Sequence, residues 1–312
     1  MSLVRQLIYI SRKFGPFHAI IRVIDATIAK IDDAWRTRLY LARTGKKPSA
    51  QKKLTVCVGR VFELDMNDRG LHRDLFLDRI REPVATSLMM LYVTSEDILL
   101  DAGANIGYFS ILMAEKCKEV YAVEPDNKNY QSLISNINLN KIDNIKSFNL
   151  AFSNKDENLH LQVSEKRNWH RTVKINEAER SAENYNNSIS ATSVDSFCAA
   201  HGIEPSVLKM DIEGFERFVI PGAVRTLGSL KALFFELHTT HMTRQEANAI
   251  LDIIDRSPLK IRHIVRYDRP GLWRQVPLSG LDRIRAGDYG IYELIYLNPD
   301  KCDSHFMNYD LV

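Results

Sequence analysis

The stretch ILLDAGANIGY, residues 98–108, decides the fold of this chain. Its apolar start is typical of a buried strand, and its two glycines mark a turn that leads into a helical pattern. At such a turn Gly103 permits the close approach of a ligand, Gly107 permits tight packing of helix on strand, and Asn105 tolerates a left-handed backbone. The stretch therefore predicts a strand, a ligand-binding turn and a helix in direct succession.

Short apolar runs alternate with helical patterns after this motif, which is the signature of βαβ units and a parallel sheet. Parallel strands are expected at Ile98–Asp101, Val120–Val123, Ile145–Ala151, Val207–Met210 and Ala232–Leu237. Two last strands, Lys260–Tyr267 and Gly290–Leu297, are separated by a loop with Pro and Gly and can form an antiparallel pair. The prediction is an α/β, Rossmann-like fold with a mostly parallel seven-stranded sheet flanked by helices. The polar segment Lys155–Asn187 is expected to be an insertion with one hairpin that covers the substrate site.

The composition is that of an ordinary globular protein, with 45% apolar and 26% charged residues. Four widely spaced cysteines form no CxxC pair, which argues against a zinc motif or a disulfide-rich scaffold. No apolar run approaches the ~20 residues that a membrane-spanning helix needs, and the N-terminus lacks the plan of a signal peptide. We therefore expect a cytoplasmic protein.

The N-terminal segment differs from the rest, because its basic side chains far outnumber its acidic ones and its apolar residues recur at helical spacing. Thr44–Lys53 reads as a linker. The predicted organisation is a basic helical extension over residues 1–53 and one catalytic domain over residues 54–312. We expect the extension to pack on its own domain or on a second subunit as a homodimer contact, with peripheral binding to an anionic membrane as the alternative.

Acidic residues end the first two parallel strands and indicate a nucleoside-like ligand. Asp101 stands at the glycine turn, and Glu124, followed by Pro125, lies at the ~20-residue distance expected for a carboxylate that binds ribose hydroxyls. The turn lacks the GxGxxG spacing that cradles a pyrophosphate. S-adenosylmethionine has no phosphate, but its ammonium group suits an acidic strand end. Adenine is expected near Asn149 and Ala151, although Asn149 can also serve only to cap a turn.

Ionisable residues also end the fourth and fifth strands, where open α/β sheets bind their ligands. They are Lys209, Asp211 and Glu213 after the fourth strand, and Glu236 and His238 on the fifth. Clusters of ionisable side chains in a cleft are typical of catalytic sites. For Glu216 we favour a role at the N-terminus of the next helix, where free N–H groups stabilise a carboxylate.

These motifs, in this order, resemble those of the FkbM family of methyltransferases. The resemblance covers roughly residues 81–238. It is carried by Asp101–Tyr108, Glu124-Pro125, Leu133, Asn136, Leu139, Asn140, Val194-Asp195, Lys209–Glu216, Pro221–Ala223 and Phe235–His238. Ser193, Met210 and Pro221 depart from the family pattern without putting cofactor binding in doubt, and residues 1–53 have no counterpart in it.

The resemblance implies the class I methyltransferase fold and O-methylation of a hydroxyl on a small molecule, sugar, glycan or secondary metabolite, with S-adenosylmethionine as cofactor. Motifs and resemblance together assign cofactor binding to Glu82, Asp101, Gly103, Ala104, Asn105, Gly107, Tyr108, Glu124, Pro125, Asn149 and Ala151. The methyl group moves by in-line displacement, so the protein must position the acceptor oxygen and take or share its proton. The candidates for this catalytic role are Lys209, Asp211, Glu213, Glu236 and His238.

Several alternatives stay open. His238 is attractive as the base because the unperturbed pKa of histidine lies near neutrality, while Asp211 with Glu236 or His238 can instead hold a divalent ion that lowers the pKa of the hydroxyl. An NAD(P)-dependent oxidoreductase uses a similar turn and acid, and a catalytically idle chain would keep the fold only as a scaffold for docking. Nucleic acid is not expected as a partner, because the basic residues concentrate in the extension.

Overall fold

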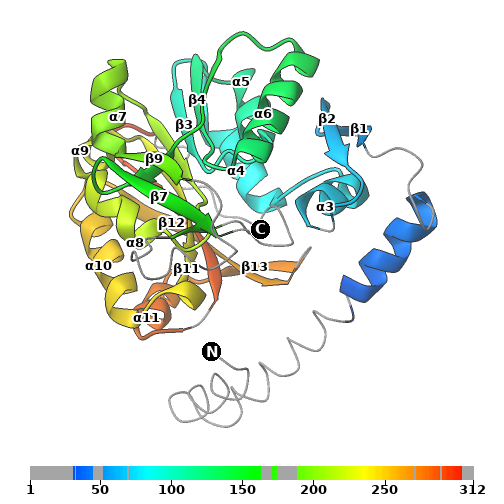
Figure 1. Cartoon of the computed structure of the whole chain (residues 1–312). Coiled ribbons are helices and arrows are strands. Elements are labelled where there is room, and N and C mark those ends of the chain that lie inside the picture. The colour runs from blue at the N-terminus through cyan, green and yellow to red at the C-terminus, as the bar shows by residue number, and fades with distance from the viewer. Residues whose placement is uncertain are drawn as a thin grey trace.

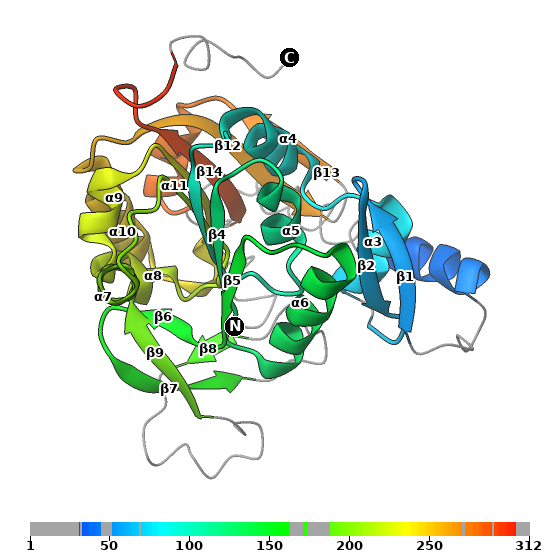
Figure 2. The same cartoon turned by 90° about the horizontal axis from the view of Figure 1, so that it is seen from above.

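The computed structural model describes residues 31, 33–44, 52–68, 70–162, 171–173, 188–269, 272–288 and 290–303. A central sheet organises this part of the chain, and helices cover both of its faces (Figures 1 and 2). Its strands, in spatial order, are β13 (Leu272–Val276), β12 (Lys260–Arg269), β14 (Ile291–Leu297), β11 (Ala232–His238), β10 (Val207–Met210), β3 (Ile98–Ala102), β4 (Glu119–Val123) and β5 (Ile145–Phe148).

The five strands from β11 to β5 are parallel, and the last strands of the chain reverse direction. Strand β14 lies between β11 and β12 and is antiparallel to both. This confirms the α/β, Rossmann-like fold, with a mostly parallel sheet and an antiparallel pair at its C-terminal side. The sheet edge formed by the carboxyl ends of β3, β4, β10 and β11 is where such folds bind their ligands.

Two features of the sheet differ from the prediction. It has an eighth strand, β13, in the segment expected to be a loop, and β13 pairs antiparallel with β12. The Pro and Gly between these strands therefore belong to a hairpin connection, which is one of the structures that such residues favour. The strand expected at Ile145–Ala151 is divided, because β5 ends at Phe148 and β6 (Ala151–Ser153) enters another sheet.

The second sheet has four strands in the order β6, β9 (Ser188–Ser193), β7 (Glu157–Gln162) and β8 (Arg171–Val173). Strands β7 and β8 are antiparallel and form the hairpin expected within Lys155–Asn187. Residues 163–170 and 174–187 of that insertion lie outside the described residues. Its predicted role as a cover for the substrate site stays a prediction.

Two apolar cores lie on the two faces of the central sheet. One face packs against α4 (Pro83–Tyr92), α5 (Tyr108–Ala114) and α6 (Asn127–Asn140), and the other against α7 (Val194–His201), α8 (Glu216–Val219), α9 (Val224–Ser229), α10 (Arg244–Asp255) and α11 (Gly280–Arg285). Leu99 and Phe234 belong to the first core, and their neighbours Leu100 and Phe235 belong to the second. Strands buried on both faces read as continuous apolar runs, which is why the sequence revealed them.

An antiparallel hairpin and a helix precede the central sheet. The hairpin consists of β1 (Lys52–Cys57) and β2 (Arg60–Asp65), and α3 (Leu71–Asp78) follows it. Residues 33–44 form a helix, in which Tyr40 is buried and donates its hydroxyl hydrogen bond to the carbonyl of Met66 at 2.5 Å. Its ring meets that of Phe76 edge-on, with centroids 5.7 Å apart.

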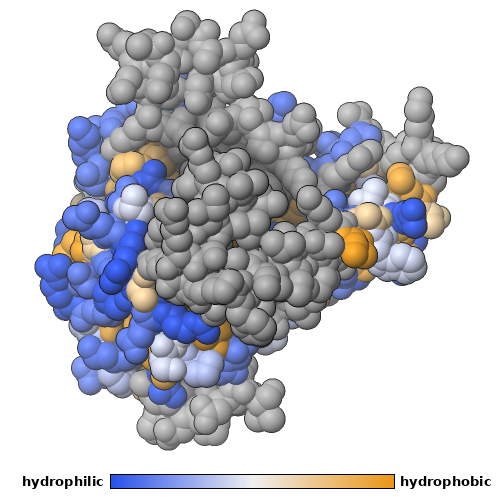
Figure 3. Space-filling model, turned by 90° about the horizontal axis from the view of Figure 1, so that it is seen from below, coloured by the Kyte–Doolittle hydropathy of each residue, from blue (hydrophilic) through white to orange (hydrophobic). Residues whose placement is uncertain are grey.

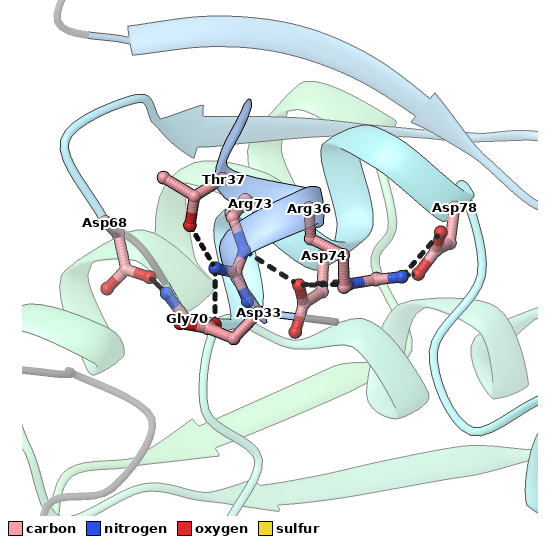
Figure 4. A network of polar contacts seen from close by, with 8 residues as sticks. All are labelled: Asp33, Arg36, Thr37, Asp68, Gly70, Arg73, Asp74 and Asp78. Atoms are coloured by element: carbon pink, nitrogen blue, oxygen red, sulfur yellow. Dashed lines mark hydrogen bonds and ion pairs between the residues drawn. The ribbon is translucent and has the colours of Figure 1, made fainter. Parts of the chain in front are cut away.

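Ion pairs also hold this helix on α3 (Figure 4). Arg36 pairs with Asp74 and Asp78, and buried Arg73 pairs with Asp33 at 2.8 Å. The described part of the extension therefore packs on its own domain. Residues 1–30 lie outside the described residues, and because β1 begins at Lys52, the proposed division at residue 53 falls inside that strand and stays a prediction.

The surface of the described residues shows small, separate groups of hydrophobic residues among hydrophilic ones in the view of Figure 3. Ile31 and Trp35 are exposed in the N-terminal helical segment, and Leu54 and Val56 are exposed on β1. Among the described helices, none is long and apolar enough to cross a bilayer. The homodimer and membrane contacts expected of the N-terminal helices stay predictions.

Candidate functional site

The turn after β3 has the left-handed conformations that its sequence predicts. Gly103, Asn105 and Gly107 have φ angles of 85°, 52° and 89°. A Cβ on Gly103 would lie 1.9 Å from the backbone oxygen of Asp211, and a Cβ on Gly107 would lie 2.5 Å from the Leu133 side chain in α6. The glycines are therefore needed for contact of the turn with the end of β10 and with α6, whereas the sequence predicted close ligand approach at Gly103 and helix-on-strand packing at Gly107.

Glu124, which follows β4, binds this turn. Its Oε2 accepts a hydrogen bond from the Asn105 N–H at 2.8 Å, and its Oε1 accepts one from the Asp126 N–H at 2.9 Å. Nearby, the Ala104 N–H donates to the carbonyl of Val123 at 3.0 Å. Burial raises the pKa of Glu124 to about 7. Each carboxylate oxygen keeps acceptor capacity, so ribose hydroxyls can still bind at this strand end.

Asn149 and Ala151, the residues assigned to adenine, lie beyond β5. The Asn149 side-chain amide donates to the carbonyl of Glu124 at 2.8 Å and to that of Pro125 at 3.0 Å. This is the turn-capping role that the sequence left open. Ala151 is buried at the start of β6.

Asp101 ends the apolar part of β3 and is buried. Ser110 donates a hydrogen bond to its Oδ2 at 2.5 Å, and its Oδ1 has no hydrogen-bond partner among the described residues. Burial raises the pKa of Asp101, and neighbouring Lys209 acts in the opposite direction. The free Oδ1 is available for the predicted contact with an ammonium group.

The segment before α4 brings Glu82 and Arg81 to the same edge of the sheet. Glu82 has a φ of 42° and its Oε1 lies 2.6 Å from the Arg81 guanidinium, which also lies 3.5 Å from Asp211 Oδ2. The Tyr108 hydroxyl, from the glycine motif, accepts a hydrogen bond from the backbone N–H of Arg81 at 3.1 Å. Tyr108 thus positions this segment through its hydroxyl.

Lys209 lies in β10, and Asp211 follows the end of this strand. The Lys209 side chain lies on the face of the sheet that α4–α6 cover. The Lys209 Nζ lies 3.8 Å from Asp211 Oδ2 and 4.7 Å from the centre of the Phe109 ring. Burial would lower the pKa of Lys209, but Asp211 and other carboxylates raise it. Burial would raise the pKa of Asp211, but Lys209 and Arg81 lower it. Asp211 is therefore an ionised carboxylate at neutral pH.

Three carboxylates surround the His238 ring. Its Nδ1 lies 2.9 Å from Glu216 Oε1, and its Nε2 lies 3.4 Å from both Glu213 Oε2 and Glu236 Oε1. Burial would lower the pKa of His238, but Glu216 and Glu213 raise it well above the usual value. This environment favours the imidazolium, which donates hydrogen bonds. Glu216 also accepts from the Gly214 N–H at 2.9 Å, in line with the role favoured for it at the start of the helix.

Sequence reasoning missed three members of this cluster: Arg81, Tyr267 and Glu293. Glu293 is 1% exposed, stands directly opposite Glu236 on the neighbouring strand, and has a pKa raised to about 8 by burial and Glu82. An acidic residue inside the apolar run of β14 is the same signal that drew attention to Glu236. Burial and Glu82 also raise the pKa of Tyr267 well above the usual value.

Carboxyl groups outnumber cationic side chains in this largely enclosed cluster, and burial raises the pKa of Asp101, Glu236 and Glu293 within it. The carboxyl groups are those of Glu82, Asp101, Asp211, Glu213, Glu216, Glu236 and Glu293, and the cations are Arg81, Lys209 and protonated His238. Buried carboxylate oxygens without partners call for a positively charged ligand. S-adenosylmethionine fits, because its sulfonium and ammonium groups are cationic while Glu124 and the glycine turn suit its nucleoside.

Comparison with known proteins agrees with these features. The profile of the family described as the methyltransferase FkbM domain matches residues 101–265, more than half of the chain. No curated protein matches the sequence.

Solved structures with similar folds share little sequence with this chain. The FkbM methyltransferase of Methylobacillus flagellatus KT is 17% identical with a TM-score of 0.43, and the match covers 72% of this chain and 52% of that one. TYW2 of M. jannaschii, solved with AdoMet, is 16% identical with a TM-score of 0.42, over 81% of this chain and 89% of that one. A putative SAM-dependent methyltransferase of Streptococcus mutans is 12% identical with a TM-score of 0.46, over 80% and 57%.

This chain thus spans about half the length of the Methylobacillus protein. Its glycine turn and its strand-end acids from Asp101 to Glu236 lie within the segment that the family profile matches, whereas β13 and β14 lie outside it. The family match favours methyl transfer over NAD(P)-dependent oxidation. The chain belongs to the FkbM methyltransferase family.

Proposed function

We propose that this enzyme transfers the methyl group of S-adenosylmethionine to a hydroxyl oxygen of a small molecule or glycan. The observation that carries the proposal is the ionised, largely enclosed Asp211 beside the glycine turn, whose Oδ1 is not used by Arg81 or Lys209. A hydroxyl that accepts the methyl group must lose its proton during the transfer. An O-methyltransferase therefore needs a group, such as an ionised carboxylate, that takes this proton.

The side chains around Asp211 divide the remaining tasks. In methyl transfer the bond from carbon to sulfur breaks as the bond from carbon to the acceptor oxygen forms. Asp211 Oδ1 accepts the hydrogen bond of the acceptor hydroxyl and then its proton. Arg81 and Lys209 keep Asp211 ionised and oriented through its Oδ2. His238, held as an imidazolium by Glu213 and Glu216, orients the neighbouring carboxylates and does not serve as the base.

The proposal is tested by methyl transfer from radiolabelled S-adenosylmethionine to a panel of hydroxylated sugars, polyketides and other small molecules. For an acceptor that is turned over, Asp211→Asn should lower turnover about 100-fold or more. Affinity for S-adenosylhomocysteine should change little. Glu119→Gln is the control, because Glu119 lies at the opposite end of β4 and pairs with Lys146. Wild-type turnover in Asp211→Asn would contradict the assignment.

The same panel separates the competing functions. Transfer RNA is included as an acceptor, and we expect no methylation of it. A chain that binds S-adenosylmethionine but methylates no member of the panel would favour a scaffold role. Binding of NAD(P)H alone would favour an oxidoreductase.

A further inference from the structure

We infer that Glu82, Asp211 and Glu236 form a binding site for one divalent cation of the magnesium or manganese type. One oxygen from each of these carboxylates lies within 4.8 Å of the others. The inference deepens the proposed function, because such an ion lowers the pKa of a hydroxyl that it binds. It rests on the proposed function only for that role, because binding of the ion depends on the side chains and not on the reaction.

In each of the three carboxyl groups, one oxygen lies close to a cationic side chain and the other does not. Glu82 Oε1 and Asp211 Oδ2 face Arg81, and Glu236 Oε1 faces His238. Among the described residues, the remaining oxygens, Glu82 Oε2, Asp211 Oδ1 and Glu236 Oε2, have no partner outside the three carboxyl groups, of which Asp211 and Glu236 can share a hydrogen bond when no ion is bound. Glu82 and Glu236 are only 6% and 7% exposed, so bulk water does not solvate these oxygens.

A fourth carboxylate, outside this set of ligands, gives independent support. Glu293 is paired in register with Glu236 across β11 and β14, and it is 1% exposed. Neither of its carboxylate oxygens has a hydrogen-bond partner among the described residues. Buried carboxyl oxygens without a partner are costly unless a ligand satisfies them. Glu293 therefore adds unpartnered acceptor oxygens beside Glu236, and a dication bound there would satisfy them.

The ligand chemistry points to a hard ion. Three carboxylate oxygens suit magnesium or manganese, and the coordination positions that they leave can hold water and the acceptor oxygen. A carboxylate oxygen has two acceptor positions, so Asp211 Oδ1 can bind the ion with one and receive the acceptor's proton with the other. Asp211, Glu213 and His238 also lie within ligating distance of one another. That set is less suitable, because both ring nitrogens of His238 face carboxylates and a protonated imidazole cannot bind a metal.

The main rival for the free oxygens is the positive charge of S-adenosylmethionine itself. The test is therefore made with and without cofactor. Binding of Mn²⁺ to the full chain is followed by the loss of its free-ion electron paramagnetic resonance signal, in buffer, with S-adenosylmethionine and with S-adenosylhomocysteine. No acceptor and no turnover are needed, so failure of the O-methylation proposal would leave this result unchanged.

We expect one Mn²⁺ per chain in all three conditions, displaced by excess Mg²⁺. Glu236→Gln and Glu82→Gln should each weaken binding at least about tenfold, and Glu119→Gln should leave it unchanged. Absence of Mn²⁺ binding by the wild-type chain, or binding by both variants that is as tight as that of the wild type, overturns the site. Loss of bound Mn²⁺ on addition of either cofactor form also overturns it, because the carboxylates then serve the cofactor.

Thermal unfolding provides a second test, because it shows whether a variant that binds no metal is still folded. Without metal, Glu236→Gln should unfold at nearly the same temperature as the wild type, because burial and Asp211 raise the pKa of Glu236 well above its usual value and glutamine has the shape of the neutral carboxyl group. Added Mn²⁺ should raise the unfolding temperature of the wild type and not that of the variant. A metal-free variant that is less stable than the wild type would assign Glu236 a structural role and overturn the inference.

Discussion

Replacing Glu124 by glutamine should remove the contribution of one titrating group to the pH dependence of this protein's stability. Burial raises the pKa of Glu124 from 4.5 to about 7 in the folded chain. The folded state then holds the proton more tightly than the unfolded chain does. The stability that this group contributes is therefore complete below its unfolded pKa and is lost as the pH rises to about 7. At about 1.4 kcal/mol for each pKa unit, the loss is about 3 kcal/mol.

The measurement is urea unfolding of the wild type and of Glu124→Gln at pH 5 and at pH 8. Glutamine has one acceptor oxygen, so one of the N–H groups of Asn105 and Asp126 loses its partner, which costs about 1–3 kcal/mol at both pH values. The informative quantity is the change in the difference between the two proteins. We expect the variant to gain about 2–3 kcal/mol relative to the wild type between pH 5 and pH 8.

The titrating groups of the acidic cluster are common to both proteins, so their contribution cancels in this comparison. Parallel pH profiles of wild type and variant would refute the assignment of a raised pKa to Glu124. Binding provides a second readout, since glutamine offers the ribose hydroxyls no charged acceptor. Affinity for S-adenosylhomocysteine at pH 8 should fall about tenfold or more, and it should be unchanged in Glu119→Gln.

Three further substitutions test the packing of the site and of the N-terminal helix. Gly103→Ala places a methyl group 1.9 Å from the Asp211 carbonyl at a positive φ, so unfolding should become easier by about 3 kcal/mol or more in urea titration; a stable variant would contradict the close contact. Ser110→Ala leaves the buried Asp101 without its hydrogen bond and should cost about 1–3 kcal/mol in the same assay, with no effect expected from Ser132→Ala on an exposed face. Tyr40→Phe removes only the hydrogen bond to Met66, and should cost about 1 kcal/mol in thermal unfolding; no change would indicate that the helix is not docked in solution.

The sequence predicted the parallel strands because each is buried on both faces and therefore reads as an apolar run. It missed the hairpin of β1 and β2 for a physical reason. In β1 the inward positions include Thr55, and the outward positions include Leu54 and Val56, which are exposed. Polarity thus does not follow the usual alternation, and the preceding lysines suggested a linker.

The sequence predicted those residues of the site that lie at the carboxyl ends of the parallel strands. Asp101, Glu124, Asp211, Glu236 and His238 all come to the edge that the strand assignments implied. The partners of these residues could not be predicted, because Arg81 arrives on a loop and Glu293 on a strand that runs the opposite way. Only the sheet order shows that Glu293 stands beside Glu236.

The position of β14 between β11 and β12 has a consequence for synthesis of the chain. Until residues 291–297 have emerged from the ribosome, β11 lacks its partner β14 along one side. All seven residues of β11 are buried in the complete structure. An apolar strand with open hydrogen-bonding groups is a template for pairing with other nascent chains. Strand β14 therefore completes the sheet only after the other strands have been synthesised. Truncation before Ile291 should yield aggregates rather than a smaller folded enzyme.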